Sequence, residues 1–454
     1  MIRLTWVQPE DLVGHELRQA REDGRDVDAV AARWRAAGGH DAPPRAGASS
    51  RPAPEGLRAL AEDLLDELAA IPSPLPEPSD LPDIVAACPS WPAPPAVPAR
   101  PDPGRVLGAW LGRAAGCLLG KPVEKIPREG IRAIAEATGN WPIRGWFTAR
   151  GLPPEIAERW PWNRRSAATS LAENIDGVPE DDDLNYALLA LALLERHGAG
   201  FSTDDVAVLW LGELPAGRVF TAERAAYRNL LAGVEPPRTA THRNPFREWI
   251  GAMIRADVYG WARPGDPGGA AALAWRDARL SHTANGIYGA MFAAAMCARA
   301  LVAASVEEVV EAGLAVVPPA SRLARAVRSA VADAAAERDF ERVVDRLYER
   351  HGGLHWVHTV NNAALVAAAL VHGEGDFTRT VGAAVAGGWD TDSAAATAGS
   401  VAGALNGGVP PRWTTRNRLA SSLTGFDGVG FDELARRTAR LWPEGAADGK
   451  EDGA

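Results

Sequence analysis

From Arg105 onward, apolar residues recur at spacings of three and four through Ala-, Leu- and Val-rich segments that short Gly/Pro loops separate. This is the period of a helix that buries one face or all of its surface, and the alternation typical of strands is scarce. The segments with this period span residues 105–120, 184–197, 220–232, 246–258, 268–278, 285–303, 306–313, 319–335, 338–351, 360–372, 378–387, 393–405 and 430–441. The pattern predicts an all-α fold, with a compact multi-helix domain over residues 104–445.

Residues 1–103 differ in character and are predicted to form an N-terminal extension. Helical periodicity is confined to residues 9–37 and 55–70, and a Pro/Gly/Ser-rich linker at 42–50 lies between them. A proline-rich stretch then runs from Pro72 to Pro103. We therefore expect an element that is separable from the domain and dispensable for its chemistry.

Both ends of the chain carry further expectations. The strand-like start contains Trp6, which would rarely lie free. If this start packs on the domain, the extension instead completes the fold. The polar residues 446–454 are predicted to be disordered.

Composition excludes several classes of protein. The net charge is −10 and no basic stripe is present, which argues against nucleic-acid binding. No uncharged apolar run approaches the length of about 18 residues that a membrane span needs, and the start lacks the apolar region of a signal peptide. The three cysteines, Cys88, Cys117 and Cys297, have no metal-type spacing and read as reduced, small apolar residues. We expect a cytoplasmic monomer without a membrane or nucleic-acid partner.

Two predicted helices are almost free of large side chains. Residues 107–116 and 393–405 are dominated by Gly and Ala, which costs helix propensity. Close approach of the backbones compensates for this cost, so both helices are expected to pack at the centre of the domain.

Acidic residues cluster at the starts of two predicted helices about two hundred positions apart. The first run is Glu180–Asp183 and the second contains Asp390 and Asp392. Carboxylates at helix N-termini are stabilised by the exposed N–H groups, so helix capping is one reading. Capping needs fewer acids than these runs contain. If the fold brings the runs together, the carboxylates repel one another unless protons or cations neutralise them.

The ligands that these runs offer are all oxygens, because neither run contains His or Cys. Such a set suits Mg²⁺, Mn²⁺ or Ca²⁺ rather than Zn²⁺. A third acidic pair, in Thr203-Asp204-Asp205, precedes an ordinary helical segment and has no Gly-rich partner. We interpret that pair as a helix N-terminus.

Three ordered blocks resemble the ADP-ribosylglycohydrolase family, of the dinitrogenase-reductase-activating type. They are the Gly-rich helix that ends in Gly116–Glu124, the acidic run 181–183, and Asp390-Thr391-Asp392-Ser393 before the Ala/Gly helix. The resemblance covers about residues 105–410. It implies a magnesium-dependent hydrolase with two Mg²⁺ ions in a cleft, for which Mn²⁺ can substitute, cleaving the bond between ADP-ribose and a protein or small-molecule acceptor.

The resemblance also implies roles for individual residues. Asp182, Asp183, Asp390, Asp392 and Ser393 match metal ligands, and Glu124 matches an acidic residue at the metal and substrate site. Glu124, Asp182 and Asp183 are the candidates for the general base.

The chain departs from the family pattern at three positions. Asp181 and Leu184 stand where the family has Thr, and Trp389 stands where a small residue is usual. Asp181 can still supply a metal-binding oxygen.

Four further residues are candidates for the substrate side: His282, His358, Asn362 and Trp389. The alternative for each is structural, as a buried or capping histidine, a helix start, or a packed indole ring. Trp141, Trp146, Trp160 and Trp162 crowd one loop-rich segment, either as packing or as a lid that stacks on adenine.

Two other functions remain open at the level of sequence. One is a non-catalytic ADP-ribose-binding module, which the intact Asp pairs argue against. The other is a hydrolase of small ribosylated or nucleoside-like metabolites.

Overall fold

The computed structural model describes residues 3–42, 47–163 and 166–443. Within these ranges the chain is helical, and its β-type pairing is limited to isolated bridges. The expected all-α fold is confirmed. The predicted disorder of residues 446–454 and part of the 42–50 linker lie outside the described residues.

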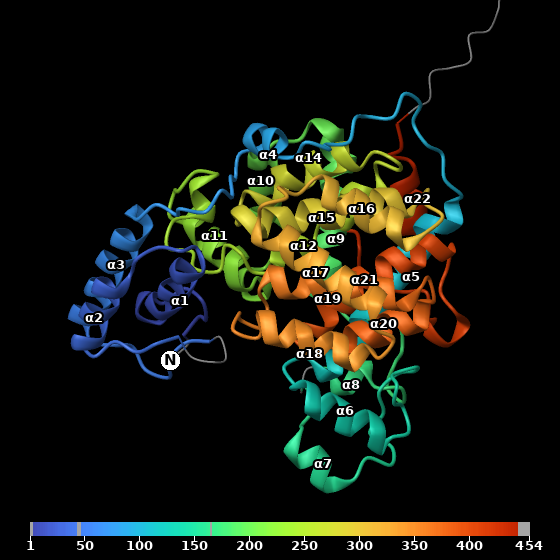
Figure 1. Cartoon of the computed structure of the whole chain (residues 1–454), viewed down its shortest axis with the longest axis horizontal. Helices are drawn as coiled ribbons and strands as arrows, with labels where there is room; N and C mark the ends of the chain where they lie inside the picture. Colours follow the sequence, from blue (N-terminus) through green and yellow to red (C-terminus); the bar gives the residue numbers. More distant parts are fainter. Residues whose placement is uncertain (1–2, 43–46, 164–165, 444–454) are drawn as a thin grey trace, which may run out of the picture.

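Two small-residue helices form the centre of the molecule (Figure 1). α5 (Pro103–Gly120) carries glycine at every fourth position from Gly108 to Gly120, and α21 (Thr391–Asn406) lies directly against this row. A Cβ atom at any of these four glycines would overlap the backbone of α21. The glycines therefore permit backbone contact that side chains would prevent, which confirms the expected central packing.

Apolar helices surround this pair and bury it. α15 (Ala284–Ala300), α19 (Thr359–Gly373), α20 (Phe377–Ala386) and α22 (Phe431–Ala439) contact α5 or α21, and the first half of α9 (Asp182–His197) is buried beside them. The outer helices are α10 (Thr203–Glu213), α11 (Thr221–Leu231), α14 (Pro267–Ala278), α16 (Val306–Ala315), α17 (Arg322–Ala336) and α18 (Phe340–His351). None of the described helices has the length and apolar character needed to cross a membrane.

A smaller lobe protrudes at the bottom of Figure 1. It contains α6 (Arg128–Ala137), α7 (Pro154–Arg159) and α8 (Ala167–Ser170). Its four tryptophans are partly buried, and two of them pack on aromatic neighbours, Trp146 on Trp413 and Trp162 on Phe147. These contacts account for packing, and the lid role stays a prediction.

The segment 246–258, expected as one helix, is divided into α12 (Gly251–Ile254) and α13 (Asp257–Trp261). The Ile254 carbonyl accepts a hydrogen bond from the buried Arg113 guanidinium instead of continuing the helical ladder. A tertiary contact therefore overrides the local helical period.

The N-terminal extension forms α1 (Pro9–Glu22), α2 (Asp28–Ala36), α3 (Glu55–Ala70) and α4 (Leu81–Ala87). The expected 9–37 pattern is interrupted at Gly24, which adopts a φ of 74° that favours glycine. α1 to α3 lie at one side of the domain beside α11 (Figure 1). Trp6 packs edge-on against Phe220 of the domain. The start of the chain thus contacts the domain, as the alternative reading expected.

Candidate metal centre

The two acidic runs meet at the N-termini of α9 and α21. Asp181 is the N-cap of α9, and its carboxylate accepts the Asp183 amide at 3.0 Å. Asp390 is the N-cap of α21 but its side chain makes no capping bond there. Ser393, in the first turn of α21, donates its hydroxyl to Asp183 Oδ2 at 3.1 Å. Capping therefore explains Asp181 but not the remaining acids.

Burial and mutual repulsion raise the pKa values of four of these carboxyl groups. Burial and the charges of Asp181 and Asp392 raise the pKa of Asp182 and of Asp183 well above the ordinary value. Burial and the charges of Asp392, Glu124 and Asp183 do the same to the pKa of Asp390. For Asp392, burial and the charges of Glu124 and Asp181 raise the pKa to about 7. The fold has thus gathered acids that cannot all stay ionised without a cation.

Lys121 neutralises part of this charge. It follows α5, and its ammonium forms an ion pair with Asp181 and donates to the Glu180 carbonyl at 3.1 Å. Burial raises the pKa of Asp181, but the Lys121 charge and the hydrogen bonds from Lys121 and the Asp183 amide together outweigh it, and the pKa is lowered. Asp181 therefore stays ionised in the cluster.

Arg113, in the middle of α5, pairs with a second carboxylate of the cluster, Asp183, and partly offsets the rise in its pKa. Its guanidinium is fully buried, lies 3.3 Å from Asp183 Oδ1 and 2.8 Å from Asp257 Oδ2, and donates to the Asp183 carbonyl at 2.8 Å. One side chain thus joins α5, α9 and α13 behind the acidic cluster.

Cys117 adds a sulfur to the cluster. Its Sγ atom and oxygens of Asp181 and Asp183 all lie within 4.8 Å of one another. Burial and the neighbouring carboxylates raise the pKa of this thiol well above its ordinary value. The oxygens of the neighbouring aspartates, rather than this thiol, match the ligand preference of a hard cation.

Glu124 lies at the accessible side of the cluster, immediately after a short 3₁₀ turn (Lys121–Val123). Its carboxylate accepts from Asn163 Nδ2 at 2.7 Å and pairs with Lys125 at 2.7 Å. Its side chain is 17% exposed, whereas that of Asp183 is 2% exposed. Solvent therefore reaches Glu124 more readily than it reaches Asp183.

This donor set fits a hard divalent cation. Within the described part of the chain, Asp181 pairs with Lys121 and Asp183 pairs with Arg113. Asp182, Asp390 and Asp392 form no ion pair with a lysine, arginine or histidine of the described residues. Buried carboxylates without a protein cation bind a proton or a metal. The cluster is thus able to hold a metal through oxygen atoms.

His282 lies in a separate buried cluster. Its Nδ1 is 2.8 Å from the Ser281 hydroxyl, and its Nε2 is 3.9 Å from Glu223, which pairs with Arg255 at 2.6 Å. Burial and the Arg255 charge lower the pKa of His282 well below its ordinary value, so the ring is neutral. The observed contacts are internal, and its substrate role stays a prediction.

His358 and Asn362 connect α19 to the acidic cluster. His358 is the N-cap of α19, and its ring accepts the Val360 amide at 3.2 Å. The Asn362 side-chain oxygen accepts the Asp390 amide at 3.2 Å. Both side chains are fully buried. Asn362 contacts the backbone of the candidate ligand Asp390. Contact with a substrate stays a prediction for His358 and Asn362.

Trp389, directly before Asp390, packs inside the protein. It is 8% exposed and stacks on Tyr348 with ring centroids 4.4 Å apart and planes 13° from parallel. This arrangement supports the packing alternative. Stacking on a substrate stays a prediction.

An open cavity of about 460 Å³ adjoins the first acidic run at Glu180. Asp176, Arg418 and Asp427 line it, together with backbone of the 418–428 loop. A second cavity of about 480 Å³, lined by Phe201, Trp275 and Arg279, includes none of the predicted site residues. Both volumes suit a small ligand, so position rather than size distinguishes them.

Sequence reasoning missed Arg113, Lys121 and Cys117 as neighbours of the cluster. A lone arginine in a Gly/Ala-rich helix and one of very few lysines were the available signals. Thr203–Asp205, by contrast, is confirmed as a helix N-terminus, because Ser202 and Asp205 form a reciprocal capping box at the start of α10.

Comparisons with known proteins identify one family. The family model described as ADP-ribosylglycohydrolase matches residues 99–448. No curated protein matches the chain significantly. One similar solved structure is described as an "ADP-ribosylglycohydrolase-related protein complex"; it is 23% identical, with 75% of this chain and 98% of that chain covered and a TM-score of 0.47.

Proposed function

This chain belongs to the ADP-ribosylglycohydrolase family, and we propose that it is a Mg²⁺-dependent hydrolase that releases ADP-ribose from an acceptor. The family acts on glycosidic bonds of ADP-ribose. The observation that carries magnesium dependence is the group Asp182, Asp390 and Asp392. These carboxylates are gathered at two helix N-termini, their pKa values are raised, and no protein cation pairs with them in the described chain.

We propose that two ions bind between the helix starts, held by Asp181, Asp182 and Asp183 from α9 and by Asp390, Asp392 and Ser393 from α21. When bound, such ions supply charge stabilisation, orientation of the ribose hydroxyls and polarisation of a water. Arg113 and Lys121 limit the charge that the ions must offset, because each pairs with one carboxylate of the cluster; Arg113 shares its charge with Asp257 outside it.

We propose Glu124 as the general base. A base must accept a proton from a water at the open side of the site, and Glu124 is more exposed than Asp183. Asn163 fixes one of its oxygens. Asp182 and Asp183 are the alternatives, but Arg113 already engages Asp183. The water oxygen bonds to the anomeric carbon as the bond between that carbon and the acceptor breaks. The proton that Glu124 takes from the water is returned to the acceptor atom as it leaves.

The acceptor is proposed to lie in the cavity beside Glu180. That cavity adjoins the metal-binding helix start and is open to solvent, which suits either a protein side chain or a small molecule. Burial of His282, His358, Asn362 and Trp389 favours a supporting role for them behind the reacting groups.

The test is an assay of ADP-ribose release. The protein is incubated with Mg²⁺ and a panel of Arg-, Ser- and phosphate-linked ADP-ribose compounds, and free ADP-ribose is measured by chromatography. Release from at least one compound, abolished by a chelator, is the expected result. Equal release with chelator would contradict metal dependence. Binding of ADP-ribose without any release would indicate a non-catalytic module, and release from nucleoside-like compounds alone would favour the small-metabolite alternative.

Asp392→Asn tests the ligand assignment. Asparagine keeps the size and one oxygen but removes the charge, so the variant is expected to stay folded, to bind Mg²⁺ at least about tenfold more weakly and to lose activity. Elemental analysis beside circular dichroism measures metal content and fold. Asp204→Asn is the matched control, because Asp204 lies in the first turn of α10, away from the cluster. Wild-type metal content in Asp392→Asn would contradict the assignment.

A further inference from the structure

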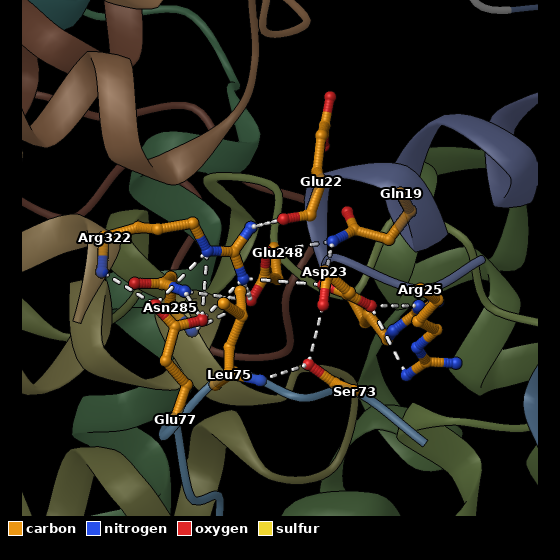
Figure 2. Close-up of polar contacts among 12 residues, drawn as sticks. Gln19, Glu22, Asp23, Arg25, Ser73, Leu75, Glu77, Glu248, Asn285 and Arg322 are labelled. Carbon is orange, nitrogen blue, oxygen red and sulfur yellow. Dashed lines mark hydrogen bonds and ion pairs between the residues drawn. The ribbon is translucent and has the colours of Figure 1, made fainter. Parts of the chain in front are cut away.

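The N-terminal extension lies outside the family match, yet its first helix buries polar groups against the domain. Figure 2 shows Gln19, Glu22 and Asp23, at the C-terminal end of α1, beside Glu248 and Arg322 of the domain; the contact drawn for Glu22 is that of its backbone carbonyl. Gln19 Nε2 donates to Glu248 Oε2 at 2.9 Å, and Arg322 donates to the Glu22 carbonyl at 3.1 Å. Extension and domain thus share one polar network.

Glu248 is the centre of this network. Besides Gln19, it accepts from Arg322 at 2.9 Å and from Asn285 Nδ2 at 3.1 Å, and its side chain is 1% exposed. Burial alone would raise the pKa of Glu248, but Arg322, His358 and Asn285 outweigh it and the pKa is lowered. Glu248 is therefore a fixed buried anion that the extension helps to hold.

His358 faces this anion and α1 at the same time. Its Nδ1 accepts the Val360 amide, so the ring proton is on Nε2. Nε2 lies 3.6 Å from Glu22 of α1 and 3.6 Å from Glu248. The Thr359 amide also donates to the Glu248 carbonyl at 3.0 Å. The start of α19 is thus bonded to the domain through the Thr359 amide and lies against the last turn of α1 through the His358 ring, whose Nε2 makes no hydrogen bond within the described residues.

The same end of α19 holds the Asp390 loop. Asn362 donates to the His358 carbonyl at 2.9 Å and accepts the Asp390 amide at 3.2 Å. A continuous path of contacts therefore runs from Glu22 through His358 and Asn362 to Asp390.

We propose that α1 is a positioning element of the candidate metal centre, acting through Glu22 on His358 and through Asn362 on the loop that carries Asp390. This inference rests on the proposed function for the identity of the site. It assigns the extension a role in that site: Glu22 and Gln19 orient the start of α19, and the orientation of α19 sets where the Asp390 amide and carboxylate lie.

The experiment uses the full chain and three variants. Glu22→Ala removes the carboxylate that faces His358, Glu22→Gln keeps an acceptor oxygen there, and Asp66→Asn is the matched control. Asp66 also joins the extension to the domain, through Arg243 at 2.7 Å, but at an exposed place outside this path. Mg²⁺ and Mn²⁺ affinities are measured by isothermal titration calorimetry, beside melting temperature and the kcat and KM of ADP-ribose release.

Glu22→Ala is expected to weaken metal affinity about threefold to tenfold. This effect is smaller than that of removing a residue that hydrogen-bonds directly to a metal ligand. Glu22→Gln is expected to restore most of that affinity, and Asp66→Asn to leave it unchanged. A purely structural contact would lower the melting temperature of Glu22→Ala and Asp66→Asn alike, without a change in metal affinity. That result, or unchanged affinity in Glu22→Ala, would overturn the proposal.

The two proposals fail in different ways. If no ADP-ribose compound is cleaved but Glu22→Ala still weakens metal binding, the proposed reaction fails and the positioning role stands. If the wild-type protein cleaves a substrate and Glu22→Ala matches it in metal affinity, the positioning role fails alone. Absence of Mg²⁺ and Mn²⁺ binding to the wild-type protein overturns both.

Discussion

Trp389 shows how a single residue near the candidate centre is held in an unfavourable backbone conformation. Its φ is 58°, in the left-handed region that a bulky residue rarely adopts. Stacking on Tyr348 compensates for this conformation, and the Tyr348 hydroxyl donates to the Gly387 carbonyl at 3.1 Å. The indole and the tyrosine thus brace the turn that leads into Asp390.

Trp389→Gly is expected to lower the free energy of unfolding by about 2–4 kcal/mol. Loss of a buried aromatic side chain costs about 3–5 kcal/mol, and relief of the left-handed conformation returns about 1 kcal/mol. Chemical denaturation measures the change. Trp389→Phe, which keeps a ring over Tyr348, should retain most of the stability. A several-fold rise in KM with unchanged stability would instead show that the ring contacts the substrate.

At the scale of elements, the contact between α5 and α21 decides where the acidic runs lie. Gly112 faces the Gly399 carbonyl so closely that a Cβ atom would overlap it. The same row of glycines ends at Gly120, whose carbonyl accepts from Thr391 in the first turn of α21 at 2.9 Å. Backbone contact along these helices therefore places Lys121 and Glu124 beside Asp392.

Gly112→Ala is expected to destabilise the protein by about 1–3 kcal/mol or more, since the added methyl group forces two backbones apart. Gly212→Ala in α10 is the matched control. The space around Gly212 is open, so alanine there should be neutral or should stabilise by up to about 1 kcal/mol. Thermal melting of both variants provides the comparison. Equal behaviour of the two would contradict close backbone contact.

The helices themselves were well predicted from periodicity. Segments such as 268–278 and 338–351 match α14 and α18 within two residues at each end. The segment 246–258 was wrong as a single helix, because Arg113 takes the Ile254 carbonyl out of the helical ladder. Periodicity reports which face is buried and carries no information on such a distant partner.

At the scale of the whole molecule, the acidic cluster makes stability depend on pH and metal. The raised pKa of Asp392, from 3.8 to about 7, means that the folded protein binds this proton more tightly than the unfolded chain. The contribution of Asp392 to stability is complete below the pKa that this group has in the unfolded chain. It is lost as pH rises through the pKa that the group has in the folded protein. The raised pKa values of Asp182, Asp183 and Asp390 act in the same direction, and the lowered pKa of Asp181 opposes them in part.

The contribution of the acidic cluster to the stability of metal-free protein is therefore expected to fall between about pH 5 and about pH 8. Buried neutral histidines such as His282 act in the opposite direction, so the comparison is made with Asp392→Asn, whose melting temperature should fall less, or rise more, over this range than that of the wild-type protein. Mg²⁺ binds the ionised carboxylates, so the rise in melting temperature that it causes should be larger at the higher pH. A metal at a hundredfold excess over its Kd adds about 2.7 kcal/mol. Differential scanning calorimetry with Mg²⁺ and with chelator tests both trends. Melting curves that are identical in Mg²⁺ and chelator at both pH values would exclude a metal in this cluster.

The extension gives a second prediction for the whole molecule. Arg247 of the domain is buried and pairs with Glu16 and Asp23 at 2.7 and 2.8 Å. Deletion of residues 1–98 removes both partners, and a buried charge left without partners costs about 3–5 kcal/mol. The truncated protein is therefore expected to melt lower or to be insoluble, contrary to the dispensability that the proline-rich sequence suggested.

A second truncated protein identifies the cause. Arg247→Leu and Arg322→Leu together remove the two cations that lose carboxylate partners from the extension. Better solubility of this variant than of the simple truncation would show that unpaired charge is responsible. A simple truncation that keeps its helical spectrum and its metal-dependent melting shift would restore the original expectation.

The sequence by itself determined the all-α class, most helices of the domain and the two acidic runs, but not α6. Each of these follows from local order along the chain: the 3.6-residue period, the density of Gly and Ala, and the placement of Asp before a buried segment. Tertiary structure alone decided which charges share the cluster. Arg113 and Lys121 pair with two aspartates, and α1 reaches Glu248 and His358 across more than two hundred residues of chain. Such pairings depend on which helices pack together in the folded protein. The residue pattern within one segment does not specify which distant helix becomes its neighbour.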